Sequence, residues 1–432
     1  MSHDSYAPPN AAPAAAVAPE TPFPPVFRVA ILLEVLERMA FYGVYINLSV
    51  YLAESAGMRD AEVGMLLGAF ALCRSWLPVM TGAASDAMGF RKSLVVSFVL
   101  YAAAYGSLAA FPSRVGGWAS VFAIAFAGAF LKPVIPATVR RYSPPGLESK
   151  GFSIFYASVN AGSVIGKVGT KLVRTAFSIR VSILNAVAAS LVGLVVVLSA
   201  FREPATVQAD VASAGTVKAA EPQTPSFWQG LKTAFSDKRL VAFLCVVAGY
   251  YLLIEQFYQT FPTYIMRQLG PAAPREYITL INPLSIAILQ LSVARLTRRL
   301  PPVVAMSSGI ALGAVSMFLM GLFPSLWGAC ASFFVFALAE MVYSPRFYEY
   351  VSSFAPKGRE GMYMGLALVP AGFGGLVGGV LSGRLIEAYL PKNGPTQPLH
   401  VWGSYACIGL VCAAAMAAFG WFARGANTEQ KT

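Results

Sequence analysis

The feature that most constrains the fold is a series of long apolar segments separated by short polar loops. A helix needs about 20 consecutive apolar residues to cross a bilayer, and this chain of 432 residues has twelve such segments. They are 27–53, 62–84, 93–112, 117–139, 151–173, 181–200, 240–266, 276–294, 302–323, 327–352, 361–386 and 400–423. Only 12% of the residues are charged, against about 25% in soluble domains, which excludes a water-soluble globule. We predict an all-α polytopic membrane protein with twelve transmembrane helices in two six-helix bundles.

One polar stretch divides the twelve segments into two groups of six. Residues 202–238 are rich in Ala, Pro, Thr and Gln, which is typical of a flexible linker. The two bundles are then expected at 26–201 and 239–424. Residues 1–25 are expected to be a disordered tail and not a signal peptide, because they lack a basic region leading into a cleavable apolar one, and 425–432 a second tail.

The distribution of Lys and Arg predicts the orientation. With both termini in the cytoplasm, inner loops and the C-terminal tail hold seventeen of these residues and outer loops and span ends hold seven. Cytoplasmic loops carry the excess of Lys and Arg in membrane proteins. We therefore expect a multi-pass protein of the cell's inner membrane with both termini and the linker inside.

Several classes of function lack the residues that they need. The five cysteines all lie within apolar segments, without the spacing of a zinc site or a disulfide framework. The two histidines lie in the tail and at a loop edge, and the net charge of +12 is spread over membrane loops instead of forming a basic domain. We expect no enzymatic activity, no metal, no cofactor and no nucleic-acid partner, and a monomer surrounded by lipid.

The first span carries an unusual group of charges. Glu34, Glu37, Arg38, Tyr42 and Tyr45 share one broad helical face, because residues three and four apart are neighbours on a helix. Two carboxylates against one guanidinium cannot both be neutralised, so one of them is a candidate proton carrier. A static ion pair that holds this span against a neighbour is the alternative.

Other spans also contain charges that are costly in lipid. Lys132 lies beside Pro133 in span four, and Glu255 and Glu340 are each the only acid deep within spans seven and ten. A charge at the bilayer centre costs about 2.5–3.5 kcal/mol on insertion scales, so such residues face a cavity or a partner. Cations in the first half and anions in the second predict a cavity that holds a zwitterion of one to three residues.

Two further cations lie within spans of the first half. Arg74 in span two and Lys167 in span five are candidates for extra positive charge in the same cavity.

Several motifs resemble those of a known family. Glu34-x-x-Glu37-Arg38 followed by Phe41-Tyr42-Gly43 resembles the E-x-x-E-R-F-x-Y-Y-G signature of the proton-dependent oligopeptide transporter family, a branch of the major facilitator superfamily. Further segments that resemble motifs of this family, in the same order, are 128–133, 151–162, 282–283, 340–345, 355–356 and 361–365. The stretch 82–92 also resembles the loop motif of the superfamily, with Gly82, Asp86, Gly89, Arg91 and Lys92 in its places.

The resemblance implies proton-coupled uptake of di- and tripeptides by alternating access, with the two halves rocking around a midplane site. It assigns proton coupling to Glu34, Glu37, Arg38 and Glu255. It assigns substrate binding to Lys132, Asn160, Asn282 and Glu340, and the residues of span one add Tyr42 and Tyr45.

The chain also departs from the family pattern. Tyr45 stands where the family has an arginine that pairs with the span-seven glutamate, so we expect Lys132 or Arg38 to pair with Glu255 instead. The added cations Arg74 and Lys167 leave open a larger or anionic substrate, such as a siderophore-like or carboxylated compound, or a peptide-like drug. A non-transporting sensor or a membrane enzyme on the same scaffold is a further alternative.

Overall fold

The structure is a computed structural model that describes residues 22–202, 236–354 and 366–429. The predicted linker and N-terminal tail lie largely outside the described residues, whereas 425–429 of the predicted C-terminal tail are helical. The motif segments 355–356 and 361–365 also lie outside them.

The first half consists of helices that follow the first six predicted spans. They are α1 (Pro25–Glu54), α2 (Asp60–Met88), α3 (Phe90–Ala110), α4 (Arg114–Tyr142), α5 (Glu148–Ala176), the short α6 (Ile179–Ser182) and α7 (Leu184–Ala200). Within a bilayer a helix satisfies its backbone polar groups internally, and each apolar segment is helical for that reason.

The second half follows the same plan, with two of its spans divided. Its helices are α10 (Lys238–Gln259), α11 (Phe261–Leu269), α12 (Arg275–Ile278), α13 (Ile281–Thr297), α14 (Pro302–Leu322), α15 (Leu326–Ser353), α17 (Val369–Tyr389) and α18 (Pro398–Glu429). Span seven breaks at Thr260 because Pro262 has no backbone N–H to continue the helix. At this break the hydroxyl of Thr260 is hydrogen-bonded to the side chains of Gln256, Ser382 and Tyr405.

Polarity is concentrated in two spans. Ten of the described helical segments are long and apolar enough to cross a membrane. Helices α1 and α5 complete the predicted twelve, and they carry Glu34, Glu37 and Arg38 in one and Lys167 and Lys171 in the other. For the described residues the predicted all-helical membrane fold is confirmed, and α1 and α5 beside the ten apolar helices are consistent with twelve spans.

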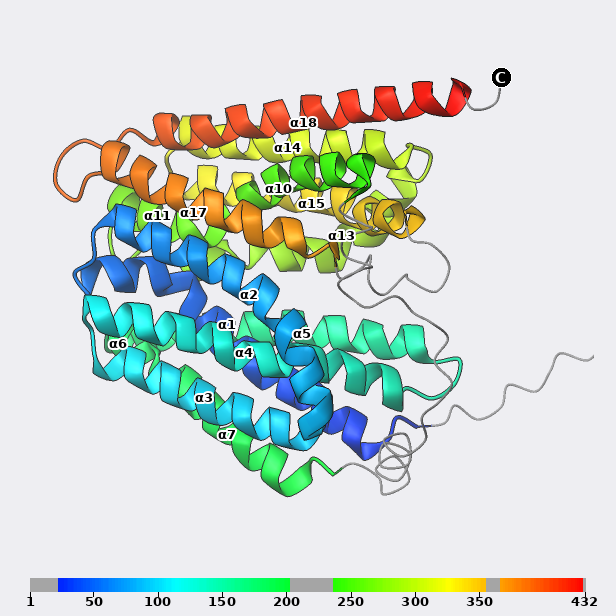
Figure 1. The fold of residues 1–432 in the computed structure, drawn as a ribbon. Helices are drawn as coiled ribbons and strands as arrows, with labels where there is room; N and C mark the ends of the chain where they lie inside the picture. The colour runs from blue at the N-terminus through cyan, green and yellow to red at the C-terminus, as the bar shows by residue number, and fades with distance from the viewer. Residues whose placement is uncertain (1–21, 203–235, 355–365, 430–432) are drawn as a thin grey trace, which may run out of the picture.

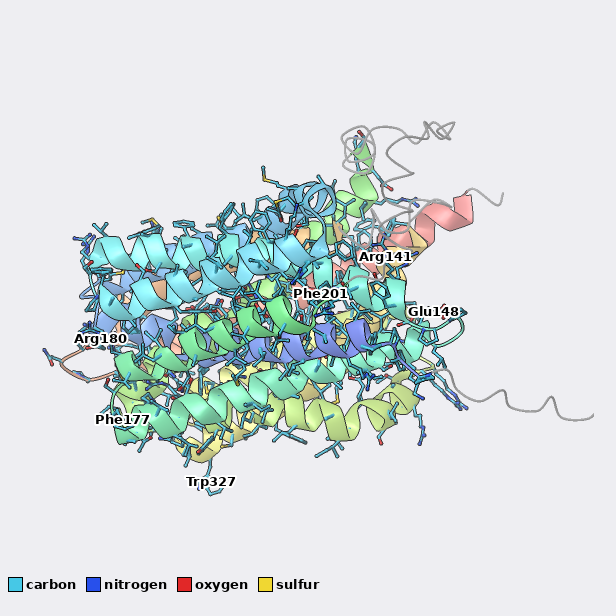
Figure 2. All side chains as sticks on the ribbon, turned by 90° about the horizontal axis from the view of Figure 1, so that it is seen from below. Arg141, Glu148, Phe177, Arg180, Phe201 and Trp327 are labelled. Carbon is cyan, nitrogen blue, oxygen red and sulfur yellow. The ribbon has the colours of Figure 1, made fainter. Side chains whose placement is uncertain are left out.

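The two halves lie side by side, with their helices running along a common direction (Figure 1). Helix α1 begins and α18 ends at the same end of the molecule, which we call the terminal face, and we call the opposite end the far face. Arg141 and Glu148 lie toward the terminal face, whereas Phe177 and Arg180 lie at the far face (Figure 2).

Helices α2 and α17 join the two halves by close backbone packing. A Cβ atom on Gly379 would lie 2.4 Å from the carbonyl oxygen of Gly64, and one on Gly383 would lie 2.5 Å from that of Asp60. Small residues allow membrane helices to approach in this way. The tight packing extends from the far face to Ser75, where the Cβ of that residue lies 3.1 Å from a Cβ placed on Gly372. The halves are therefore sealed together at the far face.

Candidate functional site

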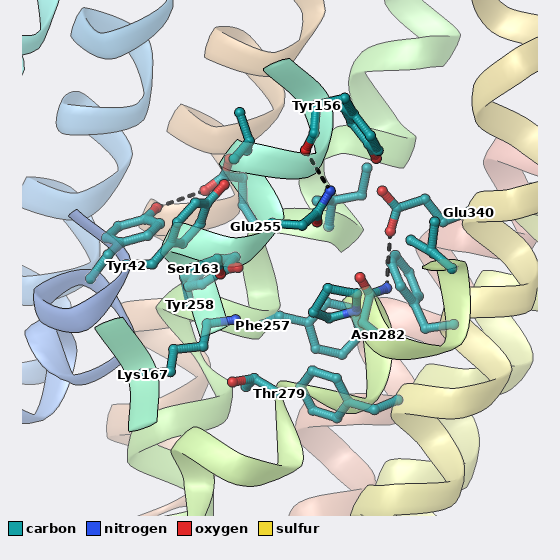
Figure 3. A pocket seen from close by; sticks show the side chains of 18 of the residues that line it. Tyr42, Tyr156, Ser163, Lys167, Glu255, Phe257, Tyr258, Thr279, Asn282 and Glu340 are labelled. Atoms are coloured by element: carbon teal, nitrogen blue, oxygen red, sulfur yellow. Dashed lines mark hydrogen bonds between the residues drawn. The ribbon is translucent and has the colours of Figure 1, made fainter. Parts of the chain in front are cut away.

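A cavity of about 250 Å³ lies between the two halves, at the terminal side of this seal. Helices α1, α2 and α5 form one wall, and α10, α13 and α15 form the other. Its polar and aromatic lining residues are Tyr42, Tyr45, Arg74, Tyr156, Asn160, Ser163, Lys167, Glu255, Phe257, Tyr258, Thr279, Asn282, Phe333, Phe336 and Glu340 (Figure 3).

An ion pair between the halves forms part of the lining. The Arg74 Nη2 atom lies 2.7 Å from Oε1 of Glu255, and the Tyr45 hydroxyl donates a hydrogen bond of 2.8 Å to Oε2. The expectation that Lys132 or Arg38 pairs with Glu255 is wrong. Arg74 in α2 supplies the cation because the close packing of α2 against α17 brings it to α10, while Tyr45 occupies the other carboxylate oxygen.

The opposite wall holds a carboxylate with a different partner. Asn282 Nδ2 donates a hydrogen bond of 3.0 Å to Oε2 of Glu340. Within the described residues no cation lies in ion-pair distance of Glu340. An amide neutralises no charge, so the carboxylate of Glu340 is available to a cationic group in the cavity.

Lys167 is the corresponding unpaired cation. The residue is 2% exposed, and its Nζ atom lies 5.5 Å from the ring centroid of Tyr42 and 5.6 Å from that of Tyr258. In the described part of the chain it has no carboxylate partner and no hydrogen-bond acceptor. Figure 3 shows Lys167 reaching into the cavity from one side, with Glu340 and Asn282 on the other.

The three charged residues predicted on α1, Glu34, Glu37 and Arg38, do not line the cavity. Arg38 Nε approaches Oε1 of Glu34 at 2.9 Å and Oε2 of Glu37 at 2.7 Å, and the hydroxyl of Tyr101 donates to the other oxygen of Glu37 at 2.7 Å. The short contact of Arg38 with Glu37 is an ion pair with poor hydrogen-bond alignment, because neither atom has an aligned partner.

Lys132 in α4 lies beside Arg74, a residue of the cavity wall. Its Nζ atom donates to the backbone oxygen of Arg74 at 3.3 Å, and the charges of Glu34, Glu37 and Arg38 act on it. In the described residues Arg38 is the ion-pair partner of the α1 carboxylates, and Lys132 acts on them only as a neighbouring charge. In this conformation Lys132 contacts the backbone of the residue that holds Glu255, and its assigned role in substrate binding stays a prediction.

The remaining predicted residues divide between the cavity and the terminal face. Tyr42 and Asn160 line the cavity, where Asn160 donates to the backbone oxygen of Tyr156 at 2.9 Å.

The loop motif runs from the last turns of α2 through Gly89 into the first turn of α3. Its Gly89 has a φ of 84°, which favours glycine, and Arg91 donates to the backbone oxygen of Leu198 at 2.7 Å. Gly82 lies within α2, while Lys92 is exposed in the first turn of α3. The backbone of Asp86 lies in α2.

Sequence reasoning missed the polar pairs that seal the far face. Arg174 in α5 contacts Glu276 in α12 through two hydrogen bonds of 2.6 and 3.0 Å, and Asn47 donates to the same carboxylate at 3.0 Å. Glu276 is fully buried. Arg267 in α11 holds Asp60 in α2 at 2.8 and 3.0 Å. Each pair joins the two halves, and in the described residues the polar contacts between halves run from the cavity to the far face.

This arrangement suits binding and movement of a solute. Among the described residues the cavity is lined by one amine and one carboxylate without an ionic partner and by aromatic side chains, and it lies between two helix bundles that contact each other on one side of it. Within the described residues no cluster of His, Cys, Asp and Glu is suited to hold a metal ion.

Comparisons with known proteins identify the family of this chain. The sequence model of the Major Facilitator Superfamily matches residues 30–379. The multidrug resistance protein MdtH of Proteus mirabilis is 24% identical over 384 residues, which cover 88% of this chain and 92% of that protein. MdtH of Salmonella paratyphi B is 24% identical over 385 residues, covering 89% and 90%.

Solved structures show the same fold at low identity. A POT family transporter in complex with 5-aminolevulinic acid superposes with a TM-score of 0.73 at 18% identity, covering 91% of this chain and 95% of that one. The nucleoside transporter NupG gives a TM-score of 0.75 at 16% identity, with 91% and 98% covered.

Proposed function

The chain belongs to the major facilitator superfamily of secondary transporters, and from this we propose that it is a proton-coupled symporter of di- or tripeptides or related small zwitterions. The superfamily and the multi-pass membrane fold are as predicted. The likeness to peptide transporters is one of fold. The proposed substrate and the proposed proton coupling rest on the residues of the site.

The observation that carries the proposal is the pair of unpaired charges in one cavity. Lys167 on the first half is buried and Glu340 on the second is half-buried, and in the described residues neither has an opposite charge beside it. Since an unpaired charge there costs about 2.5–3.5 kcal/mol or more, a ligand that carries both signs is stabilised by both walls at once. A zwitterion places its carboxylate at Lys167 and its ammonium at Glu340.

The size of the cavity favours a small solute. Its volume of about 250 Å³ lies just below the range of about 300–1,000 Å³ that is typical of ligand pockets. A siderophore-like compound needs more room than this. Arg74 also adds no free positive charge for an anionic substrate, because Glu255 neutralises it.

Proton coupling is proposed at the ion pair that joins the halves. While Glu255 is ionised it holds Arg74 and accepts from Tyr45, so that α10 is tied to α1 and α2. Protonation removes the charge that holds Arg74 and weakens this tie. Glu34, Glu37 and Arg38 connect to the same pair through Lys132, which bonds the backbone of Arg74. Substrate and proton together then favour a conformation of the two halves that neither ligand favours alone.

The orientation of the termini completes the proposal. If both termini are cytoplasmic, the sealed far face lies outside and the cavity belongs to an inward-facing conformation. Breaking the Arg174–Glu276 and Arg267–Asp60 contacts opens the outer side, and the loop motif at Gly89 lies on the inner side.

Uptake of modified dipeptides into proteoliposomes tests the proposal. We expect Ala-Ala to accumulate under an inward proton gradient, and N-acetyl-Ala-Ala and Ala-Ala-amide to compete at least tenfold less well. Lys167→Gln should remove the preference for a free carboxylate and Glu340→Gln the preference for a free amine. The exposed residues Lys238 and Glu387 supply matched controls, Lys238→Gln and Glu387→Gln. Equal competition by the free and the blocked dipeptides contradicts the proposal.

A second candidate function is the transport of aromatic or cationic drugs. The curated relatives named above are multidrug resistance proteins, and the cavity has an aromatic lining that includes Tyr42, Tyr258 and Phe336. Accumulation of ethidium against its gradient in the same proteoliposomes, with no dipeptide uptake, is the result that favours this function.

A further inference from the structure

A second hollow of about 450 Å³ lies at the far face, away from the transport cavity. Helices α2, α4 and α17 surround it. Its lining residues are Arg59, Ala61, Glu62, Met65, Arg114, Trp118, Val380 and Arg384.

The hollow carries an excess of positive charge. Arg114 and Trp118 both bind Glu62, at 2.9 Å for the ion pair and 3.1 Å for the indole hydrogen bond. Arg59 and Arg384 have no carboxylate in ion-pair distance within the described residues. Three guanidinium groups against one carboxylate leave a net charge of about +2, and two of the three groups have free donors.

The two free arginines belong to different halves of the protein. Arg59 precedes α2 in the first half and Arg384 lies in α17 of the second half. They are brought together by the glycine packing, since a Cβ on the adjacent Gly383 would lie 2.5 Å from the oxygen of Asp60 and 2.8 Å from Cα of Ala61. Closure of the far face therefore places two like charges around one hollow.

Nearby acids do not relieve this repulsion. Asp60 is held by Arg267 at 2.8 Å, and Glu54 lies 3.2 Å from Lys392. Glu387 lies one turn after Arg384 but makes no ion pair with it in the described part of the chain. An anion from outside the protein is the group that can bridge Arg59 and Arg384.

The apolar part of the hollow indicates what kind of anion fits. Met65 of α2, which is 48% exposed, and Val380 of α17 are apolar residues of its lining. Trp118 lies near the beginning of α4, and Trp is enriched at such helix ends because they meet the membrane–water interface. A free phosphate uses none of this surface, whereas a phospholipid places its acyl chains there.

We propose that this hollow binds the phosphate headgroup of an anionic phospholipid, and that the lipid stabilises the conformation in which the far face is closed. The phosphate accepts hydrogen bonds from Arg59 and Arg384 at once, with the strong geometry of guanidinium–phosphate contacts. Because the two arginines separate when the halves part, the lipid binds the closed state better and shifts the population toward it.

Cross-linking across the far face in nanodiscs tests this inference. The hydroxyl oxygens of Ser49 and Thr263 lie 3.2 Å apart on opposite halves, so the variant Ser49→Cys/Thr263→Cys reports closure by the fraction that forms a disulfide. The parent chain is the control for disulfides formed by its own five cysteines. We expect phosphatidylglycerol in a phosphatidylcholine nanodisc to raise this fraction at least threefold.

Variants of the two arginines connect the effect to the hollow. Arg59→Gln/Arg384→Gln should abolish the increase, Arg59→Lys/Arg384→Lys should keep part of it, and the exposed control Arg295→Gln/Arg299→Gln should keep all of it. An equal increase in the glutamine variant overturns the proposal. So does an equal increase from inorganic phosphate or soluble glycerol phosphate in a phosphatidylcholine nanodisc, since the site then binds a free anion.

A second measurement covers the case in which the glutamine variant fails to fold. Native mass spectrometry of the unmodified protein should retain phosphatidylglycerol in preference to phosphatidylcholine, and phenylglyoxal modification of arginine should be slowed at Arg59 and Arg384 by the bound lipid. Modification of both residues at the same rate with and without phosphatidylglycerol contradicts the inference.

Discussion

The guanidinium of Arg74 in α2 lies 2.7 Å from a carboxylate oxygen of Glu255 in α10, and this pair ties one half of the transporter to the other beside the cavity. The two charges lie where the glycine packing of α2 against α17 ends. A change of charge at Glu255 therefore acts where the two halves begin to separate.

Replacement of either member of this pair should destabilise the protein more than replacement of both. Glu255→Gln leaves the guanidinium of Arg74 without its carboxylate, and removal of one partner of a buried pair costs about 3–5 kcal/mol. Arg74→Gln/Glu255→Gln removes both charges. We expect the double variant to melt at a higher temperature than either single variant in a thermal-shift measurement. Additive losses would show that the pair is not energetically coupled.

Glu255→Gln should also separate proton coupling from substrate exchange. The amide cannot ionise, so proton-driven accumulation of Ala-Ala should fall at least tenfold, while counterflow of the same dipeptide persists. Glu349→Gln, in the exposed part of α15, is the matched control. Accumulation that follows the proton gradient equally in the variant and the parent is the contradicting result.

The sequence was sufficient for the fold and for most of the charged residues of the site. Twelve apolar segments predicted the twelve spans, and the cost of charge in lipid identified Glu255, Glu340 and Lys167. Sequence could not predict that Arg74 pairs with Glu255, because the pairing depends on how closely α2 and α17 pack. The spacing within α1 also left out Lys132, whose approach to Glu34 and Glu37 is set by helix packing.

The polar seal of the far face was beyond sequence reasoning for a different reason. Arg174, Glu276, Arg267 and Asp60 lie near helix ends, where charges are normally solvated and carry no periodic pattern. Their burial arises only when the two halves close on each other, so no local signal marks them. In the sequence, Lys and Arg near helix ends indicate only the topology.

Loss of the Glu276 carboxylate should shift the protein toward the state with an open far face. A hydrogen bond to a charged group contributes about 1.5–3 kcal/mol, which corresponds to a shift of roughly 10- to 150-fold in the population ratio. We expect Glu276→Gln to lower the disulfide fraction of the Ser49→Cys/Thr263→Cys reporter, and Arg174→Glu/Glu276→Arg to restore part of it. An unchanged fraction in Glu276→Gln would mean that the seal rests on the helix packing alone.

Addition of one methyl group at the glycine contact should block closure. A Cβ on Gly379 would lie 2.4 Å from backbone oxygen and 2.5 Å from backbone nitrogen of α2, and backbone cannot move aside as a side chain can. Gly379→Ala should abolish transport while the protein still inserts and folds. Gly106→Ala is the matched control, because nothing lies within 4 Å of a Cβ placed there. Normal uptake by Gly379→Ala would show that this contact is not needed in the transport cycle.

Lys132 and Lys167 should affect different steps of transport, since one lies beside the ion pair and the other lines the cavity. Lys132 Nζ bonds the backbone of Arg74, so Lys132→Gln should lower proton-driven uptake at least tenfold and change the Kd for Ala-Ala less than twofold. Lys167 is the free cation of the cavity, so Lys167→Gln should raise that Kd at least tenfold. Equilibrium binding to purified protein, measured beside uptake, separates the two effects, and Lys238→Gln should change neither. If Lys132→Gln weakens binding as much as Lys167→Gln does, Lys132 moves into the cavity when substrate binds, as the family resemblance implies.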